Sequence, residues 1–170
     1  MTSPLDNGSR WTALAVTLFL LGALALAAQE TPALALVNES PSVPRGLYTR
    51  MVGARPDRGA LVAVDQPDAA RPYLSSLGMP PDVKLIKRVA AERGDRVCLR
   101  GAWLEVGGRI VAVRLRDGRG TRLQPWIGCR RLDAGEVFLL GDTPGSYDSR
   151  YFGPVRVTQV DGVFRETLTW

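Results

Sequence analysis

Residues 11–28 form an uncharged stretch of 18 residues, which constrains the fold more than any other feature of the sequence. This length is at the short end of what spans a bilayer as a helix. Three interpretations are open: an uncleaved membrane anchor, a cleaved signal peptide, or a helix buried in a soluble domain. Ala25-Leu26-Ala27 has the A-x-A form of a cleavage site. We favour the anchor over the cleaved peptide, and the absence of a polar face disfavours the buried helix.

The charges that flank this stretch predict its orientation. Arg10 and the amino terminus precede it against Asp6, and Glu30 follows it, which gives a weak positive-inside bias. We therefore expect residues 1–30 to be a cytoplasmic stub and a transmembrane anchor (or a signal segment). The protein would be a single-pass protein of the inner (cytoplasmic) membrane, with the domain of residues 31–170 on the periplasmic face.

After Pro32 the sequence changes to short apolar or alternating runs separated by Gly, Pro and Asp, which is typical of β-strands joined by tight turns. We predict a mainly β, antiparallel domain, with residues 99–133 as a small hairpin-rich subdomain and residues 66–81 as a surface loop. No long amphipathic helix is expected after the anchor. The expected strands cover residues 33–37, 60–64, 83–89, 96–99, 103–106, 109–115, 136–140 and 155–164.

The chain has no histidine. This excludes Ser-His-Asp and Cys-His catalysis and zinc sites with imidazole ligands. A general base would have to be a carboxylate, a lysine, a tyrosine or a chain terminus. No metal or nucleotide cofactor is expected.

The net charge of +5 comes from 22 basic and 17 acidic residues. We interpret the excess of positive charge as a basic surface near anionic lipid. The sequence has no basic stripe interleaved with aromatic residues, which would indicate nucleic-acid binding. The two cysteines, Cys98 and Cys129, have no CxxC spacing. In a reducing compartment they would be buried thiols, whereas in the oxidising compartment that the anchor predicts they can form one disulfide.

Only two of the basic residues are lysines, Lys84 and Lys87. A lysine, unlike an arginine, can lose its proton in a protein. Both lysines can be read as ordinary surface cations. In a period-two pattern over residues 81–89, however, Lys87 shares a face with Leu85 and Val89, and Lys84 falls on the other face. Burial would lower the pKa of the Lys87 amine and allow it to act as a general base.

Ser40 and Ser42 lie in the stretch NESPSVPRGLY, which begins at Asn38. In an extended segment these three side chains point to one side, and Pro41 and Pro44 restrict the neighbouring backbone. One interpretation is a proline-rich linker between membrane and domain. The other is a rigid turn that presents a nucleophile at a fixed angle, and an inward-facing lysine elsewhere in the chain favours it.

A third polar cluster, GDTPGSYDSRYFGP, follows the apolar run at residues 137–140. Ser146, Asp148 and Arg150 alternate, so in an extended segment Asp148 and Arg150 share a face and can pair. A surface turn with a weak ion pair would explain the glycines and prolines. It would not explain why so many polar residues follow an apolar strand.

The three segments together resemble the signature boxes of type I signal peptidases, which are serine peptidases with a Ser/Lys dyad. The boxes are SPSVP from residue 40, LIKRV from residue 85, and GD with DSRY from residues 141 and 148, in the order of that family. The pattern N-x-S-x-S-x-P-x-G-x-Y, the run KRVAA and the run SYDSRYFGP are more similar to its conjugative-transfer branch, the TraF-type peptidases.

The resemblance implies a signal-peptidase-like coiled sheet and a role for each polar residue. Ser42 would be the nucleophile, and Lys87 would be its general base and later the acid for the leaving amine. The backbone N–H of Ser42 and the hydroxyl of Ser40 would form the oxyanion hole.

The resemblance also implies three supporting residues. Ser146 would hydrogen-bond to the Lys87 amine and orient it. Asp148 and Arg150 would pair and brace that wall of the site.

We therefore expect a membrane-anchored serine endopeptidase that cleaves signal or leader segments of exported proteins, and above all matures a conjugative pilin precursor. The resemblance allows cyclisation of the product. The expected partners are a membrane-bound precursor protein, either a pilin or a signal-peptide-bearing protein, and the lipid bilayer, with no nucleic acid. The alternatives are a general signal peptidase for secreted proteins, a self-cleaving repressor-type Ser/Lys peptidase, and a non-catalytic membrane-anchored β-module of a secretion or conjugation apparatus.

Overall fold

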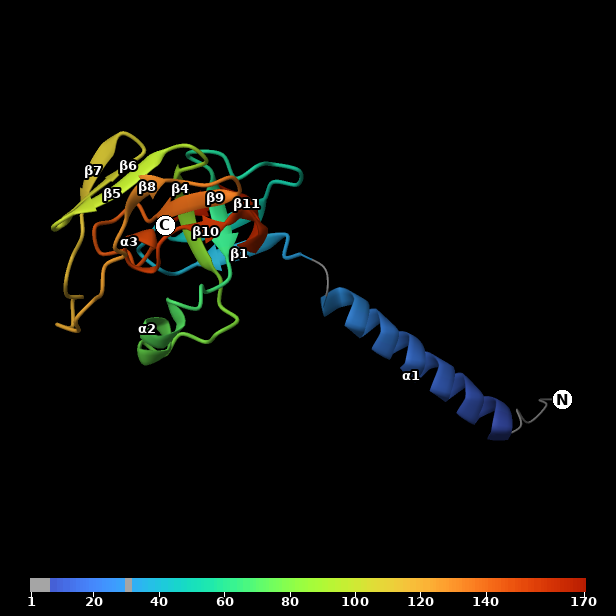
Figure 1. The fold of residues 1–170 in the computed structure, drawn as a ribbon. Coiled ribbons are helices and arrows are strands. Elements are labelled where there is room, and N and C mark those ends of the chain that lie inside the picture. The colour runs from blue at the N-terminus through green and yellow to red at the C-terminus, as the bar shows by residue number, and fades with distance from the viewer. Residues whose placement is uncertain (1–6, 30–31) are drawn as a thin grey trace. The chain divides into compact units, whose positions relative to one another are not determined.

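A computed structural model describes residues 7–29 and 32–170 of the chain (Figure 1). The chain divides into two compact units, Met1–Ala33 and Leu34–Trp170. The first unit contains a helix. The second is a β-domain that carries every residue to which the sequence assigns a catalytic or supporting role.

Helix α1 (Asn7–Gln29) covers the apolar stretch that the sequence predicts as a membrane anchor. Its described apolar side chains, Trp11 and Phe19 among them, are exposed. Within the described residues, no helix combines the length and the apolar character needed to cross a membrane. The membrane anchor therefore stays a prediction.

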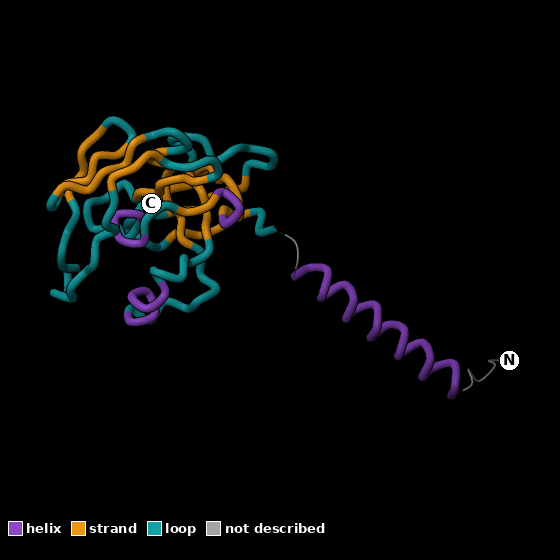
Figure 2. Tube along the Cα trace, in the orientation of Figure 1, coloured by secondary structure: helices purple, strands orange, loops and turns teal. Residues whose placement is uncertain are grey.

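The larger sheet of the domain has seven strands in the order β1-β2-β11-β3-β4-β9-β10, and neighbouring strands are antiparallel. Register shifts within β11 and β4 add the local bends by which the sheet curls (Figure 2). The prediction of a mainly antiparallel β fold is confirmed. The strands are β1 (Ala35–Asn38), β2 (Gly46–Arg50), β3 (Leu61–Val64), β4 (Leu85–Ala91), β9 (Glu136–Leu140), β10 (Val155–Arg156) and β11 (Val160–Thr169).

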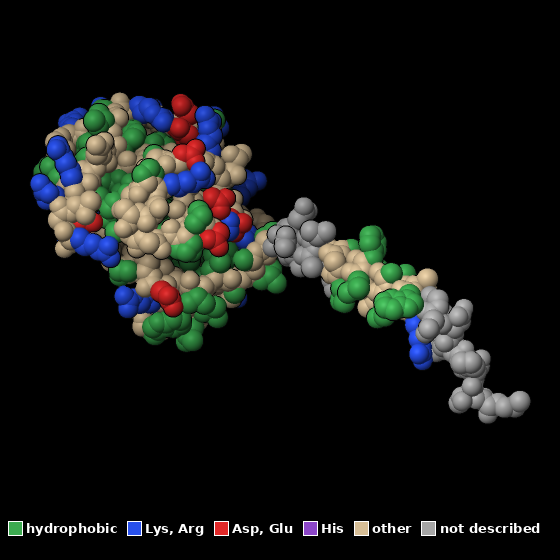
Figure 3. Space-filling model, turned by 90° about the horizontal axis from the view of Figure 1, so that it is seen from below, with side chains coloured by type: hydrophobic (Ala, Val, Ile, Leu, Met, Phe, Trp, Pro, Cys, Tyr) green, Lys and Arg blue, Asp and Glu red, His purple; other side chains and the backbone are tan. Residues whose placement is uncertain are grey.

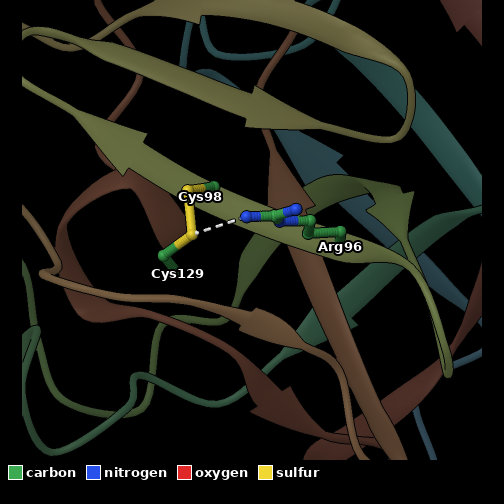
Figure 4. The surroundings of a disulfide bond; sticks show 3 residues. All are labelled: Arg96, Cys98 and Cys129. Atoms are coloured by element: carbon green, nitrogen blue, oxygen red, sulfur yellow. Dashed lines mark hydrogen bonds between the residues drawn. A yellow bond between two sulfur atoms is a disulfide. The ribbon is translucent and has the colours of Figure 1, made fainter.

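The smaller sheet has four strands in the order β7-β6-β5-β8. They are β5 (Arg96–Arg100), β6 (Trp103–Val106), β7 (Arg109–Ala112) and β8 (Cys129–Arg131). Cys98 in β5 lies directly opposite Cys129 in β8, and the two form a disulfide (Figure 4). The Arg96 guanidinium lies beside it, with Nη2 3.4 Å from the Cys129 sulfur. The disulfide expected in an oxidising compartment is thus present.

Three buried clusters stabilise the domain. The first joins the smaller sheet to β9 and includes Leu104, Val106 and Phe138. The second covers one side of β3, β4 and β9. The third lies beneath the turn that carries the two serines and includes Val43 and Tyr48. Strand β4 is buried on both faces, so a polar side chain that projects from its centre is removed from water.

On the visible face of the domain, charged side chains are scattered rather than concentrated in one patch (Figure 3). On the face drawn in Figure 3, Lys and Arg side chains lie singly or in small groups, and Asp and Glu lie beside several of them. Arginines pair with carboxylates at several places, for example Arg58 with Asp95 and Arg130 with Glu136. Such exposed pairs contribute little to stability, but they offset much of the positive charge locally.

Two short helices occupy segments for which the sequence predicts other structure. Helix α2 (Arg71–Ser76) lies inside residues 66–81, which are predicted as a surface loop. Pro72 occupies its first turn, where a missing N–H is tolerated, and Leu74 is buried. Helix α3 (Ser149–Phe152) follows Asp148, whose carboxylate accepts the Arg150 N–H and caps the helix. The extended conformation considered for this segment is therefore not the one that the chain adopts from Ser149 to Phe152.

The strands also differ from the prediction in places. Strands β2 and β8 are not predicted, because neither GLYTR nor CRR contains a run of apolar or alternating residues. The strand expected over residues 155–164 is interrupted by the 3-10 turn η1 (Val157–Gln159), where the Gln159 side chain accepts the Arg156 N–H. Strand β11 then continues to Thr169 with mostly exposed residues.

The disulfide generates a stability prediction. It links residues separated by 31 positions, for which the chain-entropy model gives about 3–4 kcal/mol of stabilisation. Adding reductant should therefore lower the free energy of unfolding of the wild-type domain by about this amount, measured by urea unfolding with tryptophan fluorescence. The Cys98→Ser/Cys129→Ser variant should not respond to reductant. An unchanged midpoint for reduced wild type would contradict the prediction.

Candidate active site

The turn between β1 and β2 carries Ser40 and Ser42, and the side chain of Asn38 closes it. Asn38 Nδ2 donates to the backbone carbonyls of Ser40, Val43 and Pro44 at 2.8, 3.1 and 2.9 Å, and its Oδ1 accepts the Ser40 N–H at 3.2 Å. The Asn38 side chain is buried. One carboxamide therefore holds both ends of a turn that contains two prolines. The segment is thus a closed turn of the domain and not the proline-rich linker considered as the alternative.

The underside of the same turn rests on the core. Val43 and Tyr48 are buried in one cluster with Ile86 of β4, and the Tyr48 hydroxyl donates to the Pro44 carbonyl. Packing below and hydrogen bonds within the turn fix the direction in which Ser42 points. Its hydroxyl is thus held at one angle, as a nucleophile requires.

Lys87 projects from the middle of β4 toward Ser42, as the period-two pattern predicts. Its Nζ lies 2.8 Å from Ser42 Oγ, and the lysine side chain is only 4% exposed. Lys84, in contrast, lies nearer the surface and pairs with Asp65 at 2.6 Å. Lys87 is therefore a buried amine in contact with a hydroxyl, whereas Lys84 is a cation paired with a carboxylate.

Burial lowers the pKa of Lys87 from its ordinary value of 10.5 to about 8. The nearby carboxylates of Asp148 and Asp142 act in the opposite direction, and the Arg150 guanidinium lowers the pKa further. Desolvation dominates these contributions. A substantial fraction of the Lys87 amine is consequently neutral at slightly alkaline pH, and the neutral amine can accept a proton from Ser42.

The two serine hydroxyls contact each other. Ser40 Oγ lies 3.0 Å from Ser42 Oγ and accepts the Ser42 N–H at 3.2 Å. The two donors that the resemblance assigns to an oxyanion hole are therefore bonded within the turn. Because Ser40 is exposed, rotation about its side-chain bond can turn the hydroxyl outward, and the same rotation releases the Ser42 N–H.

Asp148 and Arg150 form a buried, bidentate ion pair. Arg150 Nε and Nη2 donate to the two Asp148 carboxylate oxygens at 2.8 and 2.7 Å, and both side chains are at most 4% exposed. Arg150 also donates to the carbonyls of Thr143 and Ser146, and Asp148 accepts the Gly141 N–H. This arrangement is strong because the charges are hydrogen-bonded on all sides. The weak surface pair considered from the sequence is thus excluded.

Ser146 does not make the hydrogen bond that the resemblance implies. Its hydroxyl is buried but has no hydrogen-bond partner among the described residues, so the expected bond to Lys87 is absent. The hydroxyl lies against Gly141, where an added Cβ would collide with it and with the Ser42 carbonyl. Lys87 instead directs its amine at Ser42. Gly141 thus allows the close approach of Ser146 to the backbone of Ser42.

The sequence does not reveal the role of two charged residues that hold the backbone of Ser42. Arg88 Nε and Nη2 donate to the Asp142 carboxylate at 2.9 and 2.8 Å, and the Asp142 N–H donates to the Ser42 carbonyl at 2.6 Å. The period-two pattern places Arg88 on the opposite face from Lys87 and gives it no role. The pairing of Arg88 with Leu140 across β4 and β9 brings Asp142 within reach. The Arg88–Asp142 pair could not be predicted without knowing the register between β4 and β9.

A groove of about 730 Å³ opens beside Ser42 and Lys87. Its walls come from β1 and the serine turn, from β4, from residues 143–147, and from α2 with the segment that follows it. This volume lies within the usual range of small-molecule and peptide sites. In the described part of the chain, no cluster of His, Cys, Asp and Glu is arranged to hold a metal ion.

Comparison with known proteins gives consistent matches. Residues 9–170 match the family model described as signal peptidase, peptidase S26. A plasmid transfer protein TraF of Escherichia coli is 34% identical over 161 residues, covering 87% of this chain and 90% of that protein. A signal peptidase I of Bacillus caldolyticus is 36% identical over 89 residues, covering 45% of this chain and 49% of that protein. The crystal structure of a signal peptidase I from Enterococcus faecalis V583 aligns with a TM-score of 0.38 at 22% identity, covering 65% of this chain and 97% of the other.

The buried amine makes a prediction about stability that does not depend on activity. The unfolded chain binds a proton at Lys87 up to pH 10.5, and the folded chain only up to about 8. The destabilisation caused by burial is therefore full below pH 8 and declines as the pH rises from 8 to 10.5. Lys87→Met should therefore raise the free energy of unfolding at pH 7 by about 3 kcal/mol, and the gain should disappear as the pH approaches 10.5.

Lys84→Met is the matched control, because Lys84 is paired near the surface. It should give no gain at any pH, as measured by urea unfolding of both variants between pH 7 and 10.5. A Lys87→Met variant that is no more stable than wild type at pH 7 would contradict the burial of a readily neutralised amine.

Proposed function

Because the chain belongs to the signal peptidase family, peptidase S26, we propose that it is a serine endopeptidase with Ser42 as nucleophile and Lys87 as general base. The observation that supports this most strongly is the 2.8 Å contact between a buried amine and the Ser42 hydroxyl. No histidine is available in the sequence to replace the lysine. A neutral amine within hydrogen-bond distance of a hydroxyl can remove its proton.

In the proposed reaction, Ser42 Oγ transfers its proton to Lys87 Nζ as it attacks the carbonyl carbon of the scissile peptide bond. The protonated amine then donates that proton to the leaving nitrogen, and the carbon–nitrogen bond breaks to give an acyl-enzyme. Lys87, neutral again, takes a proton from water or from an amine of the substrate as either attacks the acyl carbon. It returns this proton to Ser42 Oγ as the ester bond to Ser42 breaks, which releases the product. The same group thus acts as base and as acid in turn.

The negative charge that develops on the carbonyl oxygen needs hydrogen-bond donors beside Ser42. We assign this role to the Ser42 N–H and the Ser40 hydroxyl, after the Ser40 side chain turns outward. Arg88 and Asp142 keep the Ser42 carbonyl in place on the other side. Arg150 has two effects: it braces the loop from residue 143 and contributes to the lowered pKa of Lys87.

The proposed substrate is a membrane-bound precursor with a signal or leader segment, above all a conjugative pilin precursor. The name of the Escherichia coli relative, a plasmid transfer protein, supports the conjugative choice. The disulfide supports a location outside the cytoplasm, where disulfides persist. We propose that α1 anchors the domain at the periplasmic face of the inner membrane, so that tethering of both partners raises their effective concentration.

Intact-mass spectrometry of a co-expressed conjugative pilin precursor tests the proposal. The wild-type chain should shorten the precursor, and Ser42→Ala should leave it at full mass. Thr158→Ala removes a hydroxyl from an exposed position outside the groove and should behave as wild type. A product lighter by one further water than the linear fragment would show cyclisation.

Two other outcomes would redirect the assignment. Shortening of a generic signal-peptide fusion, but not of the pilin precursor, would indicate a general signal peptidase. Full-mass precursors with wild type in both experiments would contradict a peptidase and favour a non-catalytic module of the secretion apparatus.

A further inference from the structure

The segment that follows β3 forms a wall of the groove that the sequence does not predict. We call residues 73–83, from the middle of α2 to the start of β4, the α2 wall. Tyr73, Leu77, Met79 and Val83 of this wall line the same groove as Ser42 and Lys87. A segment expected to be a surface loop is therefore part of the surface that a substrate would contact.

The α2 wall is tied to the body of the domain at both ends. Leu74 is buried in the second core cluster, beside Leu85 and Val89 of β4. Gln66, which precedes α2 and is 3% exposed, donates from Nε2 to the carbonyls of Pro80 and Val83 at 2.6 and 3.0 Å. One buried amide thus ties the end of the wall to the chain that follows β3. The wall is held by packing and by hydrogen bonds.

Tyr73 links the wall to the other parts of the site. Its hydroxyl lies 3.0 Å from Asp117 in the turn that follows the smaller sheet's β7, and its ring lies 4.3 Å from the ring of Tyr147. Tyr147 follows Ser146 directly and stacks on Tyr151 of α3 at 5.0 Å. The position of the α2 wall is therefore set relative to the loop that carries the Asp148–Arg150 pair.

Leu77 is a residue of this wall that borders the groove without being part of the core. It lines the groove and is half-buried, and it belongs to none of the three core clusters that the described residues form. Met79 also lines the groove, although it packs partly against the second cluster. The one lysine at the rim, Lys84, has its charge offset by Asp65 and Asp161. This side of the groove is therefore apolar and suits an apolar side chain.

We propose that the α2 wall is a specificity element, in which Leu77 and Met79 contact a large apolar side chain of the substrate near the cleavage site. The proposal rests on the peptidase function proposed above. A groove of about 730 Å³ has room for more than an alanine-sized group. The flexible thioether of Met79 adapts to such a side chain, and Leu77 sets the size that is accepted.

Paired size changes in enzyme and substrate test this inference. The six residues nearest the cut in a co-expressed pilin precursor are replaced one at a time by Ala, Leu or Trp, and processing is followed by intact mass. At one position wild type should process the Leu form about 10-fold faster than the Trp form. Leu77→Ala should favour Trp there, and Leu77→Trp should favour Ala, each by a similar factor.

Leu115→Ala and Leu115→Trp are the matched controls, because Leu115 is exposed and lies outside the groove. They should keep the wild-type ranking at every position. If both Leu77 variants also keep the wild-type ranking at all six positions, the inference is overturned even though processing itself occurs.

Photo-crosslinking separates this inference from the proposed function. In the Ser42→Ala chain, p-benzoylphenylalanine is placed at residue 37, on the β1 side of the groove, at residue 77, or at residue 115. Crosslinks to the uncleaved precursor from positions 37 and 77, but not 115, are expected. A crosslink from 37 alone would overturn the α2 wall and leave the peptidase in place. No crosslink from either groove position, with the pilin precursor and with a signal-peptide fusion, would overturn both.

Discussion

The rest of this structure depends on the burial of one amine against one hydroxyl. Lys87 projects from a strand that is buried on both faces, and the loss of water lowers its pKa to about 8. The carboxylates of Asp148 and Asp142 raise the pKa of Lys87, and each of them is paired with an arginine, Asp148 with Arg150 and Asp142 with Arg88. The charges around the amine are balanced in pairs, and desolvation decides its protonation. The fold accepts a destabilising residue at this position, which is typical of sites whose function needs an unusual ionisation state.

Two polar side chains organise the loops that face the amine, and both act through backbone carbonyls. Asn38 closes the serine turn, and Arg150 closes the loop from residue 143. In each case one planar group donates hydrogen bonds to several backbone carbonyls, which fixes the loop without regular secondary structure. The Asp142 N–H then joins the two loops through the Ser42 carbonyl. The position of Ser42 is thus determined by the core beneath it and by hydrogen bonds from two sides.

Local patterns predicted the parts of this arrangement that depend on local geometry. The alternation around Lys87 placed its amine inward, and short apolar runs located strands such as β6 and β9. Residues whose roles depend on strand register could not be predicted: Arg88 reaches Asp142 only because β4 pairs with β9. The α2 wall could not be predicted because its sequence is polar and proline-rich, which is typical of a loop. What orders it is the burial of Leu74 in the second core cluster, a tertiary contact. The absence of the implied Ser146–Lys87 bond could not be predicted either, because the place of the Ser146 hydroxyl depends on how residues 141–146 fold against the Ser42 backbone.

The most direct test of a neutral Lys87 acting as base is the pH dependence of kcat/KM for precursor cleavage, because this ratio reports ionisations of the free enzyme. The amine accepts a proton only when it is neutral, so activity should be low in acid, rise with a midpoint near pH 8, and level off above it. Arg150 lowers the pKa of Lys87, so the profile of a folded Arg150 variant should shift to higher pH. A profile that stays flat between about pH 5 and 9 would show that no group with this pKa controls the reaction. It would contradict the assignment of Lys87 as the base.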